Sequence, residues 1–169
     1  TEVQAHRFLA IAADVAEFDQ VNSAVASALE KFGRIDVLFN NAAVYPKAGF
    51  LEETPEEFAR AISINVCGIA NCCKAVLPAM IRNDFGRVLN LGSFADIAPI
   101  PRSAAYSASK GAVHGLTKSI AADLRDVSSN VEVHEWIPGH LNTRMSDFTG
   151  IDPAVSAEWA LRILPMMQS

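Results

Sequence analysis

The sequence predicts an α/β fold in which helices cover both faces of a parallel β-sheet. Short apolar runs, typical of strands buried on both faces, alternate along the chain with longer segments whose apolar residues recur at helical spacing. Such alternation indicates helical crossovers between parallel strands. Each apolar run is followed by polar or small residues, and the carboxyl ends of parallel strands share one edge of the sheet. We therefore expect a ligand site at that edge.

The elements follow one another in a regular order. The run FLAIA contains no polar residue and predicts the first strand, and three later apolar runs predict further strands. The helix after the first strand is expected to end at Gly33, because glycine readily adopts the left-handed conformation of a helix C-cap. The expected elements are strand 8–12, helix 18–32, strand 35–39, helix 56–82, strand 87–91, helix 106–127, strand 131–137 and helix 153–164.

The second predicted helix has the clearest start. Thr54 can cap it, Pro55 fits its first turn, and Glu57 completes a capping box. The nearby acids Glu52, Glu53, Glu56 and Glu57 raise the alternative of a metal site, but the helix cap and the helix dipole explain them better. Asn65 lies inside this helix, where asparagine has poor helix propensity, so we expect it to have a role beyond packing.

The composition is that of a single globular domain over residues 1–169. Lys and Arg number 14 against 19 Asp and Glu, and the net charge of −5 argues against nucleic acid or an anionic membrane surface as partner. No uncharged apolar stretch is long enough to span a membrane. Neither the three cysteines nor the four histidines show ligand or disulfide spacing. We therefore predict no metal site and a reducing, cytoplasmic location.

Three residues suggest acid/base chemistry at a hydroxyl or carbonyl group. Tyr106 and Lys110 lie one helical turn apart, so their side chains share a face. A free phenol has a pKa of about 10, and a neighbouring ammonium lowers that pKa, which makes the pair a plausible general acid/base. Ser93 ends the third predicted strand and could donate a hydrogen bond to the oxygen that Tyr106 protonates. Each feature is weak alone, because such pairs are common on exposed helices and serine is common in turns.

Five motifs in one order resemble the short-chain dehydrogenase/reductase family over essentially the whole chain. They are Asn40-Asn41-Ala42-Ala43, Ile64-Asn65-Val66, Leu91-Gly92-Ser93, Tyr106-Ser107-Ala108-Ser109-Lys110 and Pro138-Gly139-His140-Leu141-Asn142-Thr143. The resemblance implies a Rossmann-like, doubly wound parallel sheet with helices on both faces. It also implies an oxidoreductase that interconverts an alcohol and a ketone or aldehyde by hydride transfer with NAD or NADP.

The resemblance implies a role for each motif. Tyr106 would transfer the proton, Lys110 would lower the pKa of Tyr106 and hold the nicotinamide ribose, and Ser93 would orient the substrate oxygen. Asn65 would kink its helix and hold a water that passes protons from Lys110 to solvent. The residues implied to contact the cofactor are Asp14, Val15, Asn40, Ala42, Tyr106, Lys110, Pro138, Gly139 and Thr143.

The sequence departs from the family pattern in two ways. Ala43 stands where glycine is usual, so the backbone there must avoid the left-handed region or bear strain. The glycine-rich turn that binds pyrophosphate is not found in the sequence, nor is the residue that distinguishes NAD from NADP. We therefore expect a partial domain lacking the first two strands and the closing strand of the fold. The strand at 8–12 would then lie beside 35–39 or stand apart from the other three.

These departures leave an alternative function open, a truncated, non-catalytic fragment that folds and binds partners without turnover. For the enzyme, the expected substrate is a small-molecule alcohol or carbonyl compound, and Phe94, His140 and Leu141 are candidate contacts; surface exposure is an equal alternative for His140. A homodimer or homotetramer is also expected from apolar residues beyond one stripe of the helices at 66–82 and 106–127, as in the family's subunit contacts. These residues are Ile69, Cys72, Ala75, Val76, Leu116 and Ile120.

Overall fold

A three-stranded parallel sheet forms the centre of the molecule in the computed structural model, which describes residues 8–128 and 130–166. The strands are β1 (Val37–Asn40), β2 (Gly86–Leu91) and β3 (Val131–Trp136), in the order β1-β2-β3. Asn40 lies opposite Asn90 and Asn90 opposite Glu135, so the carboxyl ends of the strands lie at one level. The predicted parallel sheet and its edge are therefore confirmed.

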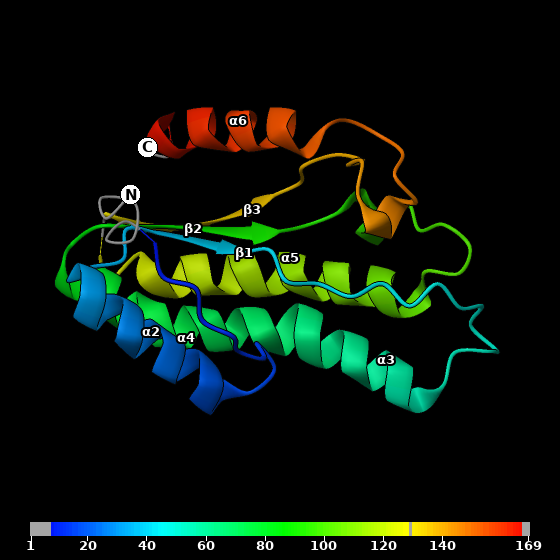
Figure 1. The fold of residues 1–169 in the computed structure, drawn as a ribbon, viewed down its shortest axis with the longest axis horizontal. Helices are drawn as coiled ribbons and strands as arrows, with labels where there is room; N and C mark the ends of the chain where they lie inside the picture. The colour runs from blue at the N-terminus through cyan, green and yellow to red at the C-terminus, as the bar shows by residue number, and fades with distance from the viewer. Residues whose placement is uncertain (1–7, 129, 167–169) are drawn as a thin grey trace.

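Helices lie on both faces of this sheet (Figure 1). With the labels of Figure 1, they are α2 (Phe18–Phe32), α3 (Pro55–Ile62), α4 (Gly68–Arg82), α5 (Ala104–Leu124) and α6 (Pro153–Ile163). One face is covered by α4 and α5, with α2 against α4, and α6 lies on the side of the other face (Figure 1). This three-layer arrangement is the predicted α/β architecture.

Local sequence explains where the helices begin and end. Gly33 ends α2 with a left-handed φ of 78°, and its N–H donates to the carbonyl of Leu29. Thr54 and Glu57 form the predicted capping box: the Thr54 hydroxyl accepts from the Glu57 N–H, and the Glu57 carboxylate accepts from the Thr54 N–H. The acids around Thr54 thus serve the helix start, as predicted.

The long helix predicted at 56–82 is interrupted. A π-helical turn at Ser63–Cys67 separates α3 from α4, and Asn65 lies in the middle of it, completely buried. Such turns insert one extra residue into the helical repeat and are frequent at functional sites. Asn65 therefore marks an irregularity in the helix, at the place where the family resemblance implies a kink.

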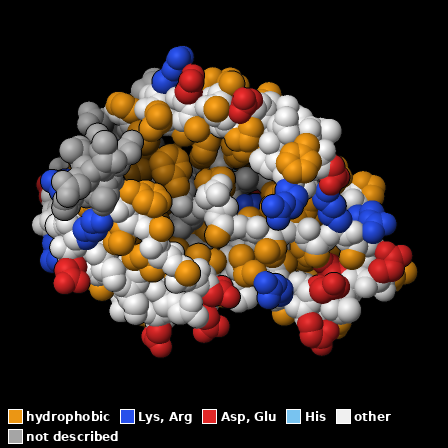
Figure 2. Space-filling view, in the orientation of Figure 1, with side chains coloured by type: hydrophobic (Ala, Val, Ile, Leu, Met, Phe, Trp, Pro, Cys, Tyr) orange, Lys and Arg blue, Asp and Glu red, His pale blue; other side chains and the backbone are white. Residues whose placement is uncertain are grey.

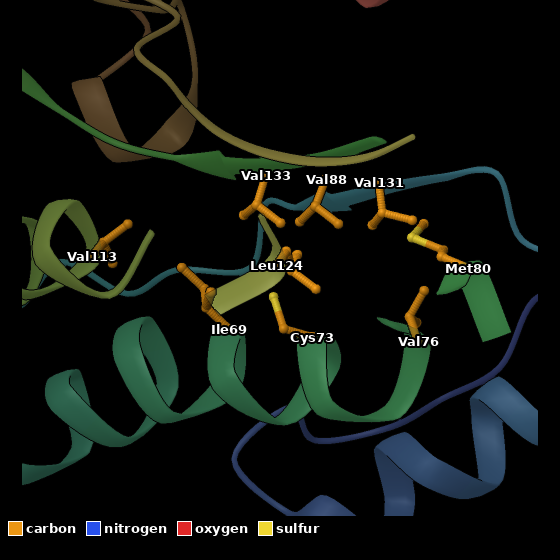
Figure 3. Packing of buried hydrophobic residues seen from close by; sticks show 9 residues of the cluster. All are labelled: Ile69, Cys73, Val76, Met80, Val88, Val113, Leu124, Val131 and Val133. Atoms are coloured by element: carbon orange, nitrogen blue, oxygen red, sulfur yellow. The ribbon is translucent and has the colours of Figure 1, made fainter. Parts of the chain in front are cut away.

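The hydrophobic core lies between the sheet and the pair α4 and α5 (Figure 3). Val88 of β2 and Val131 and Val133 of β3 point from the sheet into this layer (Figure 3). The helices contribute Ile69, Cys73, Val76 and Met80 from α4 and Val113 and Leu124 from α5. Of the cysteines, Cys73 is buried, Cys72 is half-buried and Cys67 is exposed.

The stretch Pro55–Arg82 is long and apolar enough to cross a membrane when judged by length and composition alone. That test is weak, since the core helix of a water-soluble domain also passes it. Ile69, Val76 and Met80 of this stretch lie in the core described above. The packing of α4 therefore accounts for its apolar sequence.

The prediction of a strand at residues 8–12 is wrong. This segment has no regular secondary structure, and Phe8 and Ile11 are 71% and 43% exposed. A run of apolar residues forms a strand only where a neighbouring strand pairs with its N–H and C=O groups, and within the described residues the sheet contains only β1, β2 and β3. The segment stands apart from the sheet, which is one of the two arrangements expected for it.

The side of the sheet that faces α6 remains partly open. Val37 and Phe39 of β1 are 37% and 39% exposed, and Phe39 makes an edge contact with Trp136 of β3, with 6.2 Å between the ring centres. Figure 2 shows hydrophobic side chains gathered in the hollowed middle of this view. On α6 itself, Trp159 and Leu161 are also exposed.

Candidate active site

Ser93, Tyr106 and Lys110 meet at the carboxyl end of β2. Ser93 follows this strand and caps the short 3₁₀ turn Phe94–Asp96, its hydroxyl accepting from the Ala95 N–H at 3.2 Å. Tyr106 and Lys110 lie in the first turns of α5, and the Lys110 ammonium is 5.6 Å from the centre of the Tyr106 ring. The structure thus brings three of the four predicted catalytic residues together; the fourth is Asn65.

Lys110 is a buried cation with 3% exposure. Its ammonium donates to the carbonyl of Leu91 at 2.6 Å, at the end of β2. Burial lowers the pKa of Lys110 from 10.5 to about 8, and the charge of Glu135 on β3 opposes this. The ammonium therefore loses its proton more readily than a surface lysine does.

The environment of Tyr106 differs from the expected one. Burial raises the pKa of Tyr106 above 10.0; a hydrogen bond with Ser93 opposes this effect, and nearby Tyr45 adds to it. The rings of Tyr45 and Tyr106 are 4.7 Å apart and tilted by 32°. In this chain the pKa of Tyr106 is thus raised, where Lys110 was expected to lower it, because Lys110 is directed to the Leu91 carbonyl and burial dominates.

Asn65 ties the π-helical turn to the loop after β1. Its amide nitrogen donates to the Val44 carbonyl and to the Ser109 hydroxyl, each at 2.9 Å, and its amide oxygen accepts from the Val44 N–H at 2.8 Å. Both amide hydrogens are therefore engaged. A water held by Asn65, as the family resemblance implies, would therefore have to donate to one of its oxygens, the backbone carbonyl or the second acceptor site of the amide oxygen.

Asn40 belongs to a buried chain of polar side chains that the sequence analysis missed. The Asn40 amide donates to the Asn90 amide oxygen at 2.8 Å, and Asn90 donates to the Thr117 hydroxyl at 2.9 Å. Asn40 is 7% exposed, so its side chain links β1, β2 and α5 and does not face a ligand. The signal available in the sequence was an asparagine near the end of two successive buried runs.

Asp14, Val15 and Ala42 line one hollow of about 490 Å³, together with residues of α2 and α3 and the π-helical turn. Asn71 of α4 holds the loop of Asp14 and Val15, because its amide donates to the Val15 carbonyl at 2.9 Å. Gly68 lets this loop approach: a Cβ atom there would lie 2.7 Å from the Val15 Cγ2 atom. Three of the predicted cofactor contacts therefore share a site.

The backbone between Ala42 and Val44 avoids strain. Ala43 is not among the described residues with positive φ. It therefore occupies the position where the family usually has glycine without adopting a left-handed conformation. This is one of the two outcomes expected for it.

The loop after β3 carries the remaining predicted contacts. Gly139 adopts a φ of 84°, and the Pro138 carbonyl accepts from the Ser156 hydroxyl of α6 at 3.2 Å. Thr143 caps the 3₁₀ turn Arg144–Ser146. The candidate substrate contacts are partly open: Phe94 is 63% exposed, His140 is exposed and 2.8 Å from the Thr149 hydroxyl, and Leu141 is half-buried.

These residues fit a dinucleotide in part. The hollow beside Asp14, Val15 and Ala42 and the loop at Pro138, Gly139 and Thr143 lie on the side of the carboxyl ends of the strands, where α/β proteins bind nucleotides. The sequence contains no glycine-rich turn to hold the pyrophosphate. The residues present would therefore hold the adenine and nicotinamide ends better than the middle.

Known proteins share both the sequence and the fold. The chain is 39% identical over 162 residues to 2-(R)-hydroxypropyl-CoM dehydrogenase of Xanthobacter autotrophicus, covering 94% of this chain and 64% of that protein. It is 41% identical to the oxidoreductase UcpA of Salmonella typhimurium, covering 84% of this chain and 54% of that protein. The chain thus spans 54–64% of the length of these two relatives.

Solved structures give the same result. A 3-ketoacyl-(acyl-carrier-protein) reductase from Brucella melitensis, complexed with NADH, superimposes with a TM-score of 0.85 at 30% identity, over 92% of this chain and 70% of that one. NAD+-bound xylitol dehydrogenase superimposes with a TM-score of 0.72 at 36% identity, over 78% and 50% of the two chains. The short chain dehydrogenase family matches residues 1–153. The chain belongs to the short-chain dehydrogenase family.

Proposed function

We propose that the protein containing this chain is an NAD(P)-dependent oxidoreductase that interconverts an alcohol and a ketone or aldehyde. The observation that carries the proposal is the contact of Ser93 with Tyr106, beside Lys110, at the carboxyl end of β2. The matching proteins support it, because they are dehydrogenases and reductases by name.

Each side chain has a distinct part in this proposal. Tyr106 gives a proton to, or takes one from, the substrate oxygen, and Ser93 donates a hydrogen bond to the same oxygen. Lys110 supplies a buried positive charge one helical turn away, which favours the phenolate once its ammonium turns from Leu91 towards Tyr106. The nicotinamide cofactor, when bound, accepts or supplies the hydride.

The proposed cofactor is NAD or NADP. Two matching structures contain NAD+ or NADH, and a third, ElxO, contains NADP. In this chain Asp14, Val15 and Ala42 would hold the adenine end, and Pro138, Gly139 and Thr143 the nicotinamide end. Asn40 would act through the backbone around it, since its side chain is buried.

The proposed substrate is a small alcohol or carbonyl compound, contacted by Phe94, His140 and Leu141. We also propose that the protein acts in the cytoplasm as a homodimer or homotetramer. We propose no nucleic acid or membrane as partner, since the net charge of −5 disfavours binding to either anionic surface. The structure weakens one argument for the oligomer: Ile69 and Val76 are 3% and 2% exposed and face the chain's own core.

The test of this function is Tyr106→Phe in the protein that contains this chain. The change removes only the titrating oxygen, and general acid/base catalysis contributes typically about 10²- to 10⁴-fold, so we expect kcat to fall at least about a hundredfold. Steady-state rates with a panel of alcohols and ketones and both cofactors measure this fall.

The matched control is Tyr45→Phe. It removes the phenolic oxygen of the tyrosine whose ring contacts that of Tyr106. It keeps the ring contact and is expected to cause a much smaller loss. A Tyr106→Phe variant with native circular dichroism and a rate within threefold of the unmodified enzyme would contradict the proposed role.

A further inference from the structure

Glu135 occupies a core-facing position of β3. Alternate residues of this strand face α4 and α5, and Val131 and Val133 point into that core (Figure 3). Glu135 is the next residue of the same row, so its carboxylate is directed towards α5, with a side-chain exposure of 13%. A carboxylate in this row requires compensating partners.

Two further groups converge on Glu135 from other elements. His114 of α5 places its Nδ1 atom 2.6 Å from the Glu135 Oε2 atom. Asp96, the last residue of the turn that Ser93 caps, completes the group, and one potential ligand atom from each residue lies within 4.8 Å of the others. We call Asp96, His114 and Glu135 the three-element cluster. Its members are half-buried.

The carboxylates of this cluster retain unused acceptors. The Asp96 Oδ1 and Glu135 Oε1 atoms are buried and have no hydrogen-bond partner among the described residues. Glu135 Oε1 occupies the space left by Gly92, where a Cβ atom would lie 2.0 Å from it. Leaving a buried charged acceptor without a partner destabilises a fold more than leaving a neutral one does. This points to a missing positive partner.

Within the part of the chain that the structure describes, no cation donates a hydrogen bond to these two oxygens. His114 can donate one proton through Nδ1, and that proton is directed to Glu135 Oε2. The charge of Glu135 acts on Lys110, but the Lys110 ammonium donates to the Leu91 carbonyl. The imidazole thus pairs with one oxygen of Glu135, and the unpaired Glu135 Oε1 and Asp96 Oδ1 atoms remain available to a cation.

We propose that the three-element cluster binds a divalent transition-metal ion, with Zn²⁺ as the best match. One imidazole nitrogen and two carboxylate oxygens are ligands that Zn²⁺ takes at about 2.0–2.2 Å, and three protein ligands leave a fourth position for water. An imidazole in the set favours such a metal over Mg²⁺ or Ca²⁺, which prefer oxygen ligands alone.

The position of the site gives it a structural consequence. Asp96 belongs to the turn that begins at Ser93, and His114 lies one helical turn after Lys110. A metal bound by both residues, and by Glu135, would join the turn, α5 and β3. The ion would thus hold the Ser93 turn against the helix that carries Tyr106 and Lys110.

The test uses the whole chain after treatment with EDTA and its removal. Zn²⁺ is titrated by calorimetry, and the Tm is measured with and without Zn²⁺ and with and without Mg²⁺. The key variant is His114→Ala. The control is His134→Ala. His134 lies on β3, on the face opposite to Glu135, with its Nε2 atom 3.1 Å from the Glu132 carboxylate. Its side chain is 49% exposed, close to the 45% of His114.

The proposal predicts that Zn²⁺ binds, and raises the Tm of, the unmodified chain and His134→Ala, with little effect of Mg²⁺. The affinity of His114→Ala should fall at least about tenfold, since even outer-shell changes weaken metal sites by about 10- to 100-fold. If His114→Ala does not fold, Asp96→Asn, which keeps the shape of the turn residue, should show the same loss. Co²⁺ should bind with visible absorption bands that His114→Ala or Asp96→Asn removes.

Several outcomes overturn the proposal. Absence of heat and of a Tm shift with Zn²⁺ in the unmodified chain would leave His114 as a simple hydrogen-bond partner of Glu135. Equal losses in His114→Ala and His134→Ala would identify adventitious binding by surface histidines. None of these results depends on turnover, so the metal site and the proposed function fail independently.

Discussion

Lys110 combines two conflicting demands in a single side chain. Its ammonium is almost fully removed from water, which disfavours the charge, yet its place beside Tyr106 is useful only while the charge is present. Burial lowers the pKa of Lys110 to about 8, and the negative charge of Glu135 opposes this fall. Lys110 therefore changes charge just above neutral pH.

This pKa predicts how stability depends on pH. Between pH 8 and 10.5 the unfolded chain holds a proton on Lys110 that the folded chain has released, so the unmodified chain gains stability as pH rises through this window. Relative to Lys110→Met, which does not titrate, the gain is at most about 3 kcal/mol, from about 1.36 kcal/mol per pKa unit. Urea unfolding of both chains at pH 7 and pH 10, with EDTA present, measures this difference.

Lys118→Met serves as the control, because Lys118 is an exposed lysine on the same helix. Its stability relative to the unmodified chain should change little between the two pH values. A constant difference between Lys110→Met and the unmodified chain at both pH values would contradict the lowered pKa.

At the scale of elements, the approach of the loop at Val15 to α4 depends on Gly68. A Cβ atom at Gly68 would lie 2.7 Å from the Val15 Cγ2 atom and 3.1 Å from its Cβ atom. We expect Gly68→Ala to destabilise the chain by about 1–3 kcal/mol through overpacking, despite the better helix propensity of alanine.

The double variant Gly68→Ala/Val15→Ala tests the cause. Removing the Val15 Cγ2 atom relieves the closer contact, so the cost of Gly68→Ala should fall by at least about 1 kcal/mol in the Val15→Ala background. Chemical denaturation of the four chains gives this coupling. Additive effects of the two substitutions would show that the close approach does not determine the need for glycine.

Local sequence signals were enough to predict most elements. They were not enough where the structure of a segment depends on pairing with another strand. Gly33 and the capping box at Thr54 act within a few residues, so the sequence predicted both ends correctly. The apolar run at 8–12 had the right composition for a strand, but a strand forms only with a neighbour. The extra residue of the π-helical turn was visible only as an asparagine in a helix, because periodicity cannot locate a single insertion.

Some residues of the candidate site could also be predicted from the sequence, and others could not. Tyr106 and Lys110 were found from their four-residue spacing, Ser93 from its place after a strand, and all three from motifs that resemble the family. Asp96, His114 and Glu135 were not, because their meeting depends on how a turn, a helix and a strand pack, and their sequence spacing carries no ligand pattern. Asn90 was missed because a polar residue inside a buried strand is read as a simple break in its pattern.

For the molecule as a whole, the sequence leaves the phosphate part of the cofactor without a recognised site. We expect this chain by itself to bind NADH and NADPH weakly, without saturation below about 1 mM, since the glycine-rich turn supplies the N–H groups that hold pyrophosphate. Calorimetric titration with both dinucleotides measures the affinity. Micromolar binding would show that the residues around Asp14 and Gly139 are enough.

The proposed homo-oligomer is also a property of the whole molecule. The half-buried residues Cys72, Ala75, Leu116 and Ile120 on α4 and α5 remain as candidate contacts. Light scattering of the protein containing this chain should give the mass of a dimer or tetramer, and Ile120→Glu should shift it towards the monomer. A monomeric mass that is independent of concentration would refute the proposal.

The buried chain of Asn40, Asn90 and Thr117 fixes the alignment of the strands. Apolar residues recur along β1 and β2, so hydrophobic burial alone distinguishes poorly between the observed alignment and one slipped by two residues. Such a slip would separate the Asn40 and Asn90 amides, which now meet in register, and leave each without its hydrogen bond in the interior. The amides therefore select one alignment among several that the apolar residues would tolerate.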